Sequence, residues 1–192
     1  MGALAPWSGG VSLWILRHAQ PLIAPGICYG SLDMPADAAL TQAAAREAAE
    51  VIPRHAMLRY STLQRCEQLA KALLGLRPDL AENCMADARL VEMDFGVHEG
   101  RAWAEIPQAH LQTWTDDFAH HRFGGAESVA GFMQRVAGVW DAYCADDAPD
   151  TVWISHAGVA RAAALLSQGI RCPGTATDWP REGPGYGEWI RL

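Results

Sequence analysis

The fold is decided first by residues 13–21, which read LWILRHAQP. Residues 11–16 form a short apolar run typical of a buried strand, and Gly9-Gly10 before them act as a breaker. This strand delivers the adjacent Arg17 and His18 into a turn. An Arg-His pair at a strand end is more often solvated than catalytic, so its meaning depends on partners elsewhere in the chain.

The length and composition indicate one domain spanning residues 1–192. Half of the 192 residues are apolar, which is enough for a proper core. The formal charge of -7, with no basic run to balance it, excludes a nucleic-acid or anionic-membrane surface as partner. Any anion site must therefore be local, and we expect a small molecule as the ligand.

The cysteines and the N-terminus indicate a cytoplasmic protein. The five cysteines are odd in number and widely spaced, without a C-x-x-C pair, so we expect free thiols in a reducing compartment. Residues 1–10 lack the features of a signal peptide and are expected to be a loose segment. No apolar run approaches the roughly twenty residues that span a bilayer. Monomer and homodimer both stay open.

Apolar periodicity and breakers predict alternating strands and helices along the chain. Helices are expected from Thr41, as N-cap, to Ile52, from the Ser61-Thr62 caps to Leu74, and over 107–119, 129–143 and 159–168. Strands are expected at 57–60, 85–92, 151–155 and 186–192. This order predicts an α/β fold, a three-layer sandwich with a mostly parallel open sheet and helices on both faces.

Three groups of polar residues follow predicted strands directly. Arg17-His18, Arg65 and His156 each lie just beyond the C-terminal end of a strand. In open α/β sheets that edge binds ligands. Arg65 stands in the first turn of a helix, where it opposes the helix dipole and gains nothing locally. A shared ligand at this edge would explain all three placements.

Several common catalytic templates are missing. The chain has no P-loop, no G-x-S-x-G elbow, no H-E-x-x-H and no G-x-G-x-x-G before a helix. No cysteine is followed six positions later by arginine, which excludes a cysteine-phosphatase loop. An arginine, histidine and glutamate set remains.

That set resembles the histidine phosphatase superfamily, in its phosphoglycerate-mutase-like branch. The matching segments, in the family's order, are LRH at 16–18, STLQR at 61–65, LVEMDFG at 90–96, GAES at 125–128 and ISHAG at 154–158. Ala19 replaces the usual glycine after the histidine, and Gln20-Pro21 replace the mutase-like continuation. The following APGICYG at 24–30 and Asp33-Met34-Pro35 look instead like the α-ribazole phosphatases of cobalamin biosynthesis.

The resemblance implies a phosphohistidine mechanism without a metal or other cofactor. His18, neutral at cytoplasmic pH, would attack phosphorus, while Arg17, Arg65 and His156 surround the phosphate oxygens. His156 would act either protonated or as a neutral hydrogen-bond donor. Glu92 would protonate the leaving alkoxide and then activate water. Asp94 and Glu99 are rival acids.

Further contacts are expected around the phosphate. The backbone N–H of Ala157 at a helix start would add an oxyanion contact. Gln20, Tyr29 and Gly30 lie in the loop expected to bind the substrate.

For the other aromatic, thiol and imidazole groups, a purely structural role is the alternative to a functional one. Tyr29, Trp103, Trp114 and Phe123 either line the pocket or serve packing. Cys28 would be reactive only as an exception, and His120-His121 are expected to be solvated rather than metal ligands.

The function expected is hydrolysis of α-ribazole 5'-phosphate or adenosylcobalamin 5'-phosphate. Another small-molecule phosphatase or a phosphoglycerate mutase of the same superfamily is the first alternative. Only 64 positions separate Glu92 from His156, which leaves little room for the insertions of mutases. A non-catalytic phospho-ligand-binding protein is the alternative from another class, and the presence of both His18 and Glu92 speaks against it.

Overall fold

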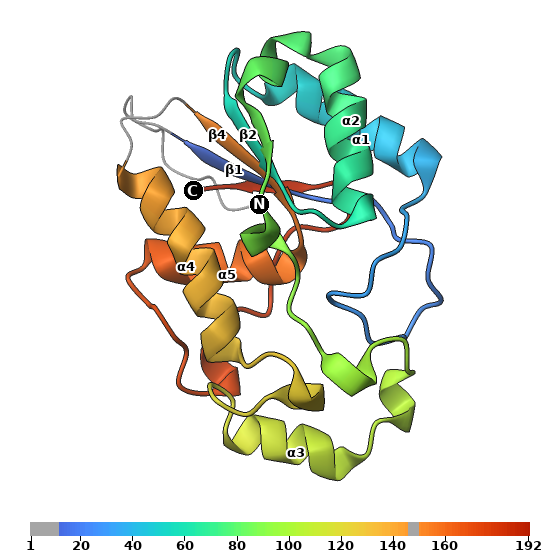
Figure 1. Ribbon diagram of the computed structural model, residues 1–192, viewed down its shortest axis with the longest axis vertical. Coiled ribbons are helices and arrows are strands. Elements are labelled where there is room, and N and C mark those ends of the chain that lie inside the picture. Colours follow the sequence, from blue (N-terminus) through green and yellow to red (C-terminus); the bar gives the residue numbers. More distant parts are fainter. Residues whose placement is uncertain (1–11, 146–149) are drawn as a thin grey trace.

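The computed structural model describes residues 12–145 and 150–192 and contains a five-stranded sheet with the order β3-β2-β4-β1-β5 (Figure 1). The strands are β1 (Leu13–Arg17), β2 (Met57–Tyr60), β3 (Cys84–Ala86), β4 (Thr151–Ser155) and β5 (Trp189–Arg191). Neighbouring strands are parallel except β5, which runs antiparallel to β1. The mostly parallel sheet predicted from the sequence is therefore confirmed.

The register brings the functional segments to one edge. Arg17 pairs with Ser155, and Tyr60 pairs with Ile154. Because β1, β2 and β4 are parallel, their C-terminal ends meet at the same edge of the sheet. His18, Ser61 and His156, the next residues in the chain, are thereby brought together.

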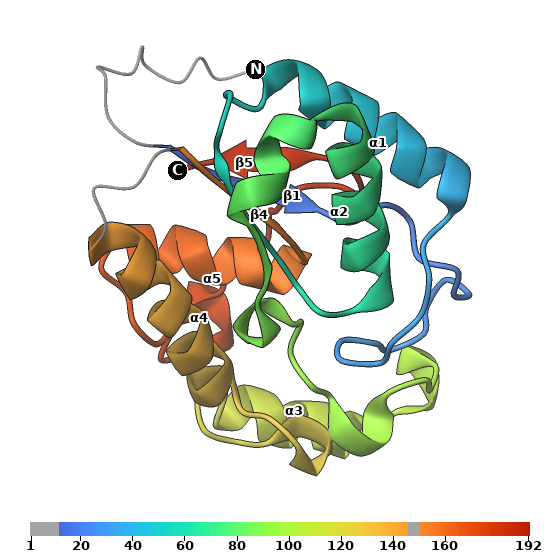
Figure 2. The same ribbon diagram turned by 45° about the horizontal axis from the view of Figure 1, so that its top comes forward.

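Helices cover both faces of the sheet. They are α1 (Ala38–Val51), α2 (Gln64–Leu76), α4 (Val129–Ala145) and α5 (Ala157–Ser167), whereas α3 (Gln108–Asp116) lies beyond the edge of the sheet (Figure 1). Helices α1 and α2 pack on one face with Leu16, Leu58 and Ile154, and α4 and α5 pack on the other with Ile15 and Trp153 (Figure 2). Successive residues of a strand thus enter opposite cores, as the pleat requires. The three-layer α/β sandwich is confirmed.

A smaller layer lies beyond the C-terminal edge of the sheet. It consists of α3 and three short 3-10 helices, η3 (Gly96–His98), η4 (Trp103–Glu105) and η5 (Phe123–Gly125). Cys28, Ile106 and Phe123 form its small core. We call this layer, residues 95–127, the cap (Figure 1, yellow-green).

Two predicted helix starts are wrong, because side chains from outside the helix provide the caps. The first helix begins at Ala38, where the Asp37 carboxylate accepts the Leu40 N–H at 2.9 Å. Helix α2 begins at Gln64, whose N–H donates to Asp33 at 2.8 Å instead of to Ser61 or Thr62. Asp33 is distant in sequence, so local spacing could not reveal this cap.

The predicted strand over 85–92 is also wrong. Strand β3 ends at Ala86, and a 3-10 turn, η2 (Ala88–Leu90), follows. The Asp87 carboxylate accepts the Arg89 N–H at 3.0 Å and so stabilises the turn. The last strand is shorter than predicted and comprises Trp189–Arg191, and α5 begins two residues earlier, at Ala157.

The remaining expectations concern the N-terminus and the membrane. The loose segment 1–10 and the strand start at Val11 lie outside the described residues. Within the described part of the chain, no helix is long and apolar enough to cross a bilayer.

The shared core gives a stability prediction. Leu58→Ala removes a fully buried side chain between the sheet and α2, so we expect a loss of about 2–5 kcal/mol in the free energy of unfolding, measured by urea denaturation. The control Leu22→Ala changes a side chain that is 61% exposed and should cost less than about 0.5 kcal/mol. Equal losses in the two variants would contradict this packing.

Candidate active site

One cavity of about 290 Å³ lies at the C-terminal edge of the sheet, between the sheet and the cap. The five residues predicted to carry the chemistry all line it: Arg17, His18, Arg65, Glu92 and His156. They come from the end of β1, the first turn of α2, the segment after η2 and the residue after β4.

His18 is buried and held in one tautomer. Its Nδ1 lies 2.7 Å from the Ala19 carbonyl oxygen, to which it donates, and its Nε2 accepts from Arg65 Nε at 3.2 Å. Burial, with the positive charges of Arg65 and Arg17, lowers the pKa of His18 to about 3. The imidazole is therefore neutral at physiological pH, and its lone pair lies on Nε2, where it accepts the Arg65 N–H.

Arg65 is fully buried, and its donors are satisfied mainly by backbone. Nη1 donates to the Leu32 carbonyl at 2.8 Å, and Nη2 donates to the Gly30 carbonyl at 2.6 Å. It forms no ion pair with a carboxylate among residues 12–145 and 150–192. The carbonyl dipoles of the loop 19–37 thus offset the unfavourable position of Arg65 at a helix start. The positive charge of Arg65 has no carboxylate partner in the described residues.

Arg17 is held by a residue that the sequence did not reveal. Its guanidinium carbon lies 3.8 Å from the ring centre of Tyr186, and Nη1 donates to the Pro184 carbonyl at 3.1 Å. Tyr186 also hydrogen-bonds to Tyr29, oxygen to oxygen, at 2.7 Å. Only the fold brings the C-terminal segment here, so the sequence offered no signal for Tyr186 beyond its aromatic character.

His156 is buried beside His18, with ring centres 5.1 Å apart. Its Nε2 lies 2.9 Å from the Ser61 hydroxyl oxygen. Burial, together with the fields of His18 and Arg65, lowers the pKa of His156 well below its usual value. It is therefore a neutral imidazole near pH 7, one of the two states left open by the sequence.

Glu92 points at the start of α5. Its Oε2 accepts the Gly158 N–H at 2.9 Å, and its Oε1 accepts the Met93 N–H at 3.0 Å. A Cβ on residue 158 would lie 2.1 Å from Oε1, so glycine is required there for this approach. Ala157, the preceding residue, lines the same cavity.

A partly buried ion pair holds the backbone around Glu92. Arg135 of α4 donates from Nη2 to the Glu92 carbonyl at 2.9 Å and pairs with Glu127 at 2.7 Å. The rival acids lie outside the cavity lining. Asp94 accepts the Gly96 N–H, and Glu99 accepts N–H groups of the 30–32 loop. Glu92 is thus the only carboxylate on the wall of the cavity in the described residues.

Comparison with known proteins now decides the family. Residues 13–174 match the model of the histidine phosphatase superfamily (branch 1). The chain belongs to this superfamily. It is 27% identical over 162 residues to a Hydrogenobacter thermophilus protein named "Putative phosphoserine phosphatase 2", covering 82% of this chain and 79% of that one.

Solved structures share the fold of this histidine phosphatase. A mycobacterial glucosyl-3-phosphoglycerate phosphatase superposes with a TM-score of 0.76 at 23% identity, over 95% of this chain and 90% of the other. An Escherichia coli protein described as a putative alpha-ribazole-5'-P phosphatase gives 0.76 at 22%, over the same shares. These likenesses confirm the phosphoglycerate-mutase-like fold.

The predicted substrate-loop residues fall into two groups. Tyr29 lines the cavity of the histidine phosphatase, whereas Gly30 contributes its carbonyl to Arg65 and Gln20 is exposed and does not line the cavity. A Cβ on Gly30 would lie 1.8 Å from the Met93 carbonyl oxygen, so this loop can approach the Glu92 segment only with glycine there.

Aromatic side chains from the cap and from neighbouring segments form much of the cavity wall. The lining rings are Tyr29, Phe95, Trp103, Trp114, Phe118, Phe132 and Trp179. Phe123 stands behind them and stacks on Trp114, with ring centres 4.5 Å apart. Trp114 Nε1 and Arg161 Nε are buried N–H donors without a hydrogen-bond partner in the described residues, and both residues line the cavity.

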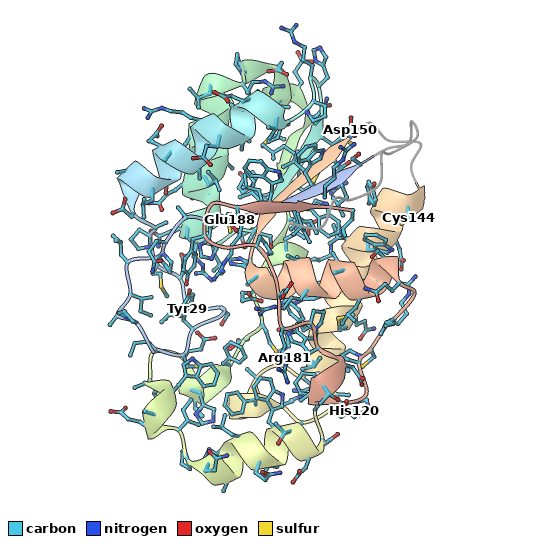
Figure 3. The ribbon with its side chains drawn as sticks, turned by 180° about the vertical axis from the view of Figure 1, so that it is seen from behind. Tyr29, His120, Cys144, Asp150, Arg181 and Glu188 are labelled. Carbon is cyan, nitrogen blue, oxygen red and sulfur yellow. The ribbon has the colours of Figure 1, made fainter. Side chains whose placement is uncertain are left out.

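The other candidate groups lie apart from this chemistry. Cys28 is buried, and burial with the nearby Glu99 raises the pKa of its thiol to about 12, so it is not a thiolate at neutral pH. His120 is exposed at the end of the cap, far from Tyr29 (Figure 3). No group of three or more metal-ligating side chains occurs among the described residues.

The lowered pKa of His18 predicts how stability depends on pH. A histidine that is neutral when folded takes up its proton more readily when unfolded, so its contribution is complete above about pH 6.5 and is lost as the pH falls toward about 3. Between pH 6.5 and 4.5 the free energy of unfolding should fall with a slope up to about 1.4 kcal/mol per pH unit for each such histidine.

Urea denaturation of the wild-type protein and of His18→Asn across that range measures this contribution. The variant, which has no titratable group at position 18, should show a smaller slope. A His18 resonance that titrates near pH 6.5 in the folded protein would contradict the buried, neutral imidazole.

Proposed function

We propose that the protein hydrolyses phosphomonoesters through a phosphohistidine on His18. One observation carries this proposal: a neutral, buried imidazole, with its lone pair on Nε2, lines a cavity that is also lined by three arginines, a second histidine and one carboxylate. Phosphoryl transfer needs a nucleophile, hydrogen-bond donors to the phosphate oxygens and an acid for the leaving group.

In the first step, the Nε2 lone pair of His18 forms a bond to phosphorus while the ester P–O bond breaks. The leaving oxygen takes the bonding pair and a proton from the Glu92 carboxyl group, which releases the alcohol. The imidazole ring gains positive charge. The Ala19 carbonyl oxygen, which accepts the Nδ1–H at 2.7 Å, stabilises this charge. Glu92 is left as a carboxylate.

In the second step, Glu92 takes a proton from water, whose oxygen attacks phosphorus. The N–P bond breaks, and its electron pair returns to Nε2, so inorganic phosphate leaves and both residues regain their starting states. No metal is required, because Arg17, Arg65 and His156 supply the donors to the phosphate oxygens.

Arg65 would change partners when the phosphate binds. Its Nε–H donates to the lone pair that must attack, at 3.2 Å. A phosphate oxygen is a stronger acceptor for a guanidinium than a neutral imidazole, so the N–H would pass to the phosphate and free the nucleophile. The same residue thereby protects the tautomer of His18 and binds the substrate.

The aromatic wall favours an alcohol with a flat ring, and we infer α-ribazole 5'-phosphate as the substrate. Trp103 and Trp114 offer stacking surfaces for its base, and the free donors Trp114 Nε1 and Arg161 Nε suit its ribose oxygens. The 24–30 loop resembles α-ribazole phosphatases. A cavity of about 290 Å³ would take only the nucleotide end of adenosylcobalamin 5'-phosphate.

A second candidate is a small phosphomonoester that carries a carboxylate. Arg161 forms no ion pair in the described residues and lines the cavity, so it could bind such a group. The curated relative from Hydrogenobacter is named as a phosphoserine phosphatase. The position of Arg161 would suit the carboxylate of phosphoserine or of a phosphoglycerate.

The role of Glu92 can be tested through the leaving group. In Glu92→Gln, phosphorylation of His18 by α-ribazole 5'-phosphate should slow about 10²- to 10⁴-fold, because its alkoxide needs a proton. Phosphorylation by p-nitrophenyl phosphate, whose phenolate leaves unassisted, should slow far less and give a burst of p-nitrophenol. Rapid-quench kinetics measure both rates.

Asp94→Asn is the matched control, because this carboxylate does not line the cavity, and it should slow neither reaction substantially. Equal losses with the two esters in Glu92→Gln would contradict a general acid at this position. Wild-type activity should persist in EDTA, and its loss would contradict a metal-free mechanism.

A substrate panel tests the alcohol. We expect kcat/KM for α-ribazole 5'-phosphate to exceed that for phosphoserine and 3-phosphoglycerate, and Trp114→Ala to lower it about tenfold or more through lost stacking. The control His120→Ala, exposed and remote, should leave it unchanged. Preference for phosphoserine, abolished by Arg161→Met, would instead establish the carboxylate-bearing substrate.

A further inference from the structure

The contacts around the second histidine point to a positioning residue outside the expected catalytic set. Because His156 is neutral and buried, it carries one N–H, and only the nitrogen that bears this hydrogen can donate to the phosphate. The phosphate site therefore works only if the tautomer is correct. The surrounding hydrogen bonds decide which nitrogen carries the proton.

Nε2 of His156 faces two groups that each have a hydrogen to donate. The Ser61 oxygen lies 2.9 Å away, and the Cys66 sulfur lies 3.5 Å away. Burial raises the pKa of the Cys66 thiol to about 12, so it keeps its hydrogen. The same thiol lies 3.5 Å from the Ser155 carbonyl oxygen, to which it can donate.

Counting donors and acceptors separates the two tautomers. Ser61 is fully buried, and its oxygen accepts the Leu63 N–H at 3.4 Å. If Nε2 carried the proton, the Ser61 hydroxyl hydrogen would be left, among the described residues, with only the Cys66 sulfur, which is a weak acceptor. If Nε2 is bare, the hydroxyl donates to it at 2.9 Å, and the remaining N–H of the ring, on Nδ1, is left for a ligand in the cavity. Because the group is buried, the arrangement in which the hydroxyl donates to the stronger acceptor, the ring nitrogen, is the more stable one.

The other ring nitrogen is then the donor. Among the described residues, no oxygen or nitrogen hydrogen-bonds to Nδ1, and its nearest partner is the Cys66 sulfur at 4.0 Å. His156 lines the cavity beside His18. An Nδ1–H is thus available to a phosphate bound there.

We propose that Ser61, by donating its hydroxyl hydrogen to Nε2, holds His156 as the Nδ1–H tautomer and so makes it a neutral donor to the transferring phosphoryl group. Ser61 is a positioning residue, since it acts through His156. The second half of this inference rests on the proposed phosphatase function, whereas the tautomer is a property of the protein itself.

The tautomer can be measured directly in protein with ¹⁵N-labelled histidine. Long-range ¹H–¹⁵N spectra distinguish a protonated from a bare ring nitrogen, and the spectrum of His156→Asn identifies the His156 signals. In the wild-type protein near pH 7 we expect a bare Nε2 and a protonated Nδ1. The reverse pattern would overturn the proposal, whatever the activity of the enzyme.

Two variants then test the part played by Ser61. Ser61→Ala should move proton density to Nε2 and lower kcat for p-nitrophenyl phosphate about 10- to 100-fold, somewhat less than the loss of an oxyanion donor outright. Ser61→Thr keeps the hydroxyl and should keep both the Nδ1–H tautomer and activity within a few-fold. Ser167→Ala, an exposed serine of α5, is the matched control.

An Nδ1–H tautomer that persists in a folded Ser61→Ala protein would contradict the role of Ser61. If that variant does not fold, the wild-type and Ser61→Thr spectra still decide whether the hydroxyl accompanies the expected tautomer. If the tautomer is as expected but no ester releases phosphate, the proposed function is refuted. The assignment of Nε2 as the acceptor would still hold.

Discussion

The active-site region depends on one constraint, the burial of the Arg65 guanidinium without a carboxylate partner in the described residues. Its donors reach His18 and two carbonyls of a loop that follows β1 by more than ten residues. Burying an unpaired cation is costly unless hydrogen bonds satisfy it. If the loop lay elsewhere, the buried guanidinium of Arg65 would lose two of its hydrogen-bond acceptors.

Other contacts of that loop follow from the same placement. Asp33 caps the helix that carries Arg65, so the loop stabilises the helix start that holds the cation. Gly30 passes so close to the Met93 carbonyl that no side chain fits, and this approach joins the loop to the Glu92 segment. His18, Arg65 and Glu92 are thus held together by one continuous set of side-chain and backbone contacts.

The electrostatics of the cavity contrast with the rest of the molecule. The chain carries a formal charge of -7, yet the cavity is lined by three arginines and a single carboxylate. Both active-site histidines are neutral because burial and the neighbouring arginines lower their pKa. A dianionic phosphate would neutralise this local excess of positive charge, which explains why the arginines are arranged without carboxylate partners.

Much of this arrangement could be predicted from the sequence, because parallel strands bring their C-terminal ends to one edge. The placement of Arg17, His18 and His156 follows from strand positions alone. Contacts made by residues far apart in the chain could not be predicted: the Asp33 cap, Tyr186 stacking on Arg17, and the Gly158 approach to Glu92. Each depends on tertiary proximity, which periodicity does not encode.

The proposed mechanism requires that His18 carries the phosphoryl group during turnover. Intact-protein mass spectrometry, after mixing with p-nitrophenyl phosphate and quenching under alkaline denaturing conditions, tests it most directly. We expect one phosphoryl adduct per chain that is lost in acid, maps to His18 and is absent from His18→Asn. Phosphate release without any adduct, or an adduct that persists in His18→Asn, would contradict it.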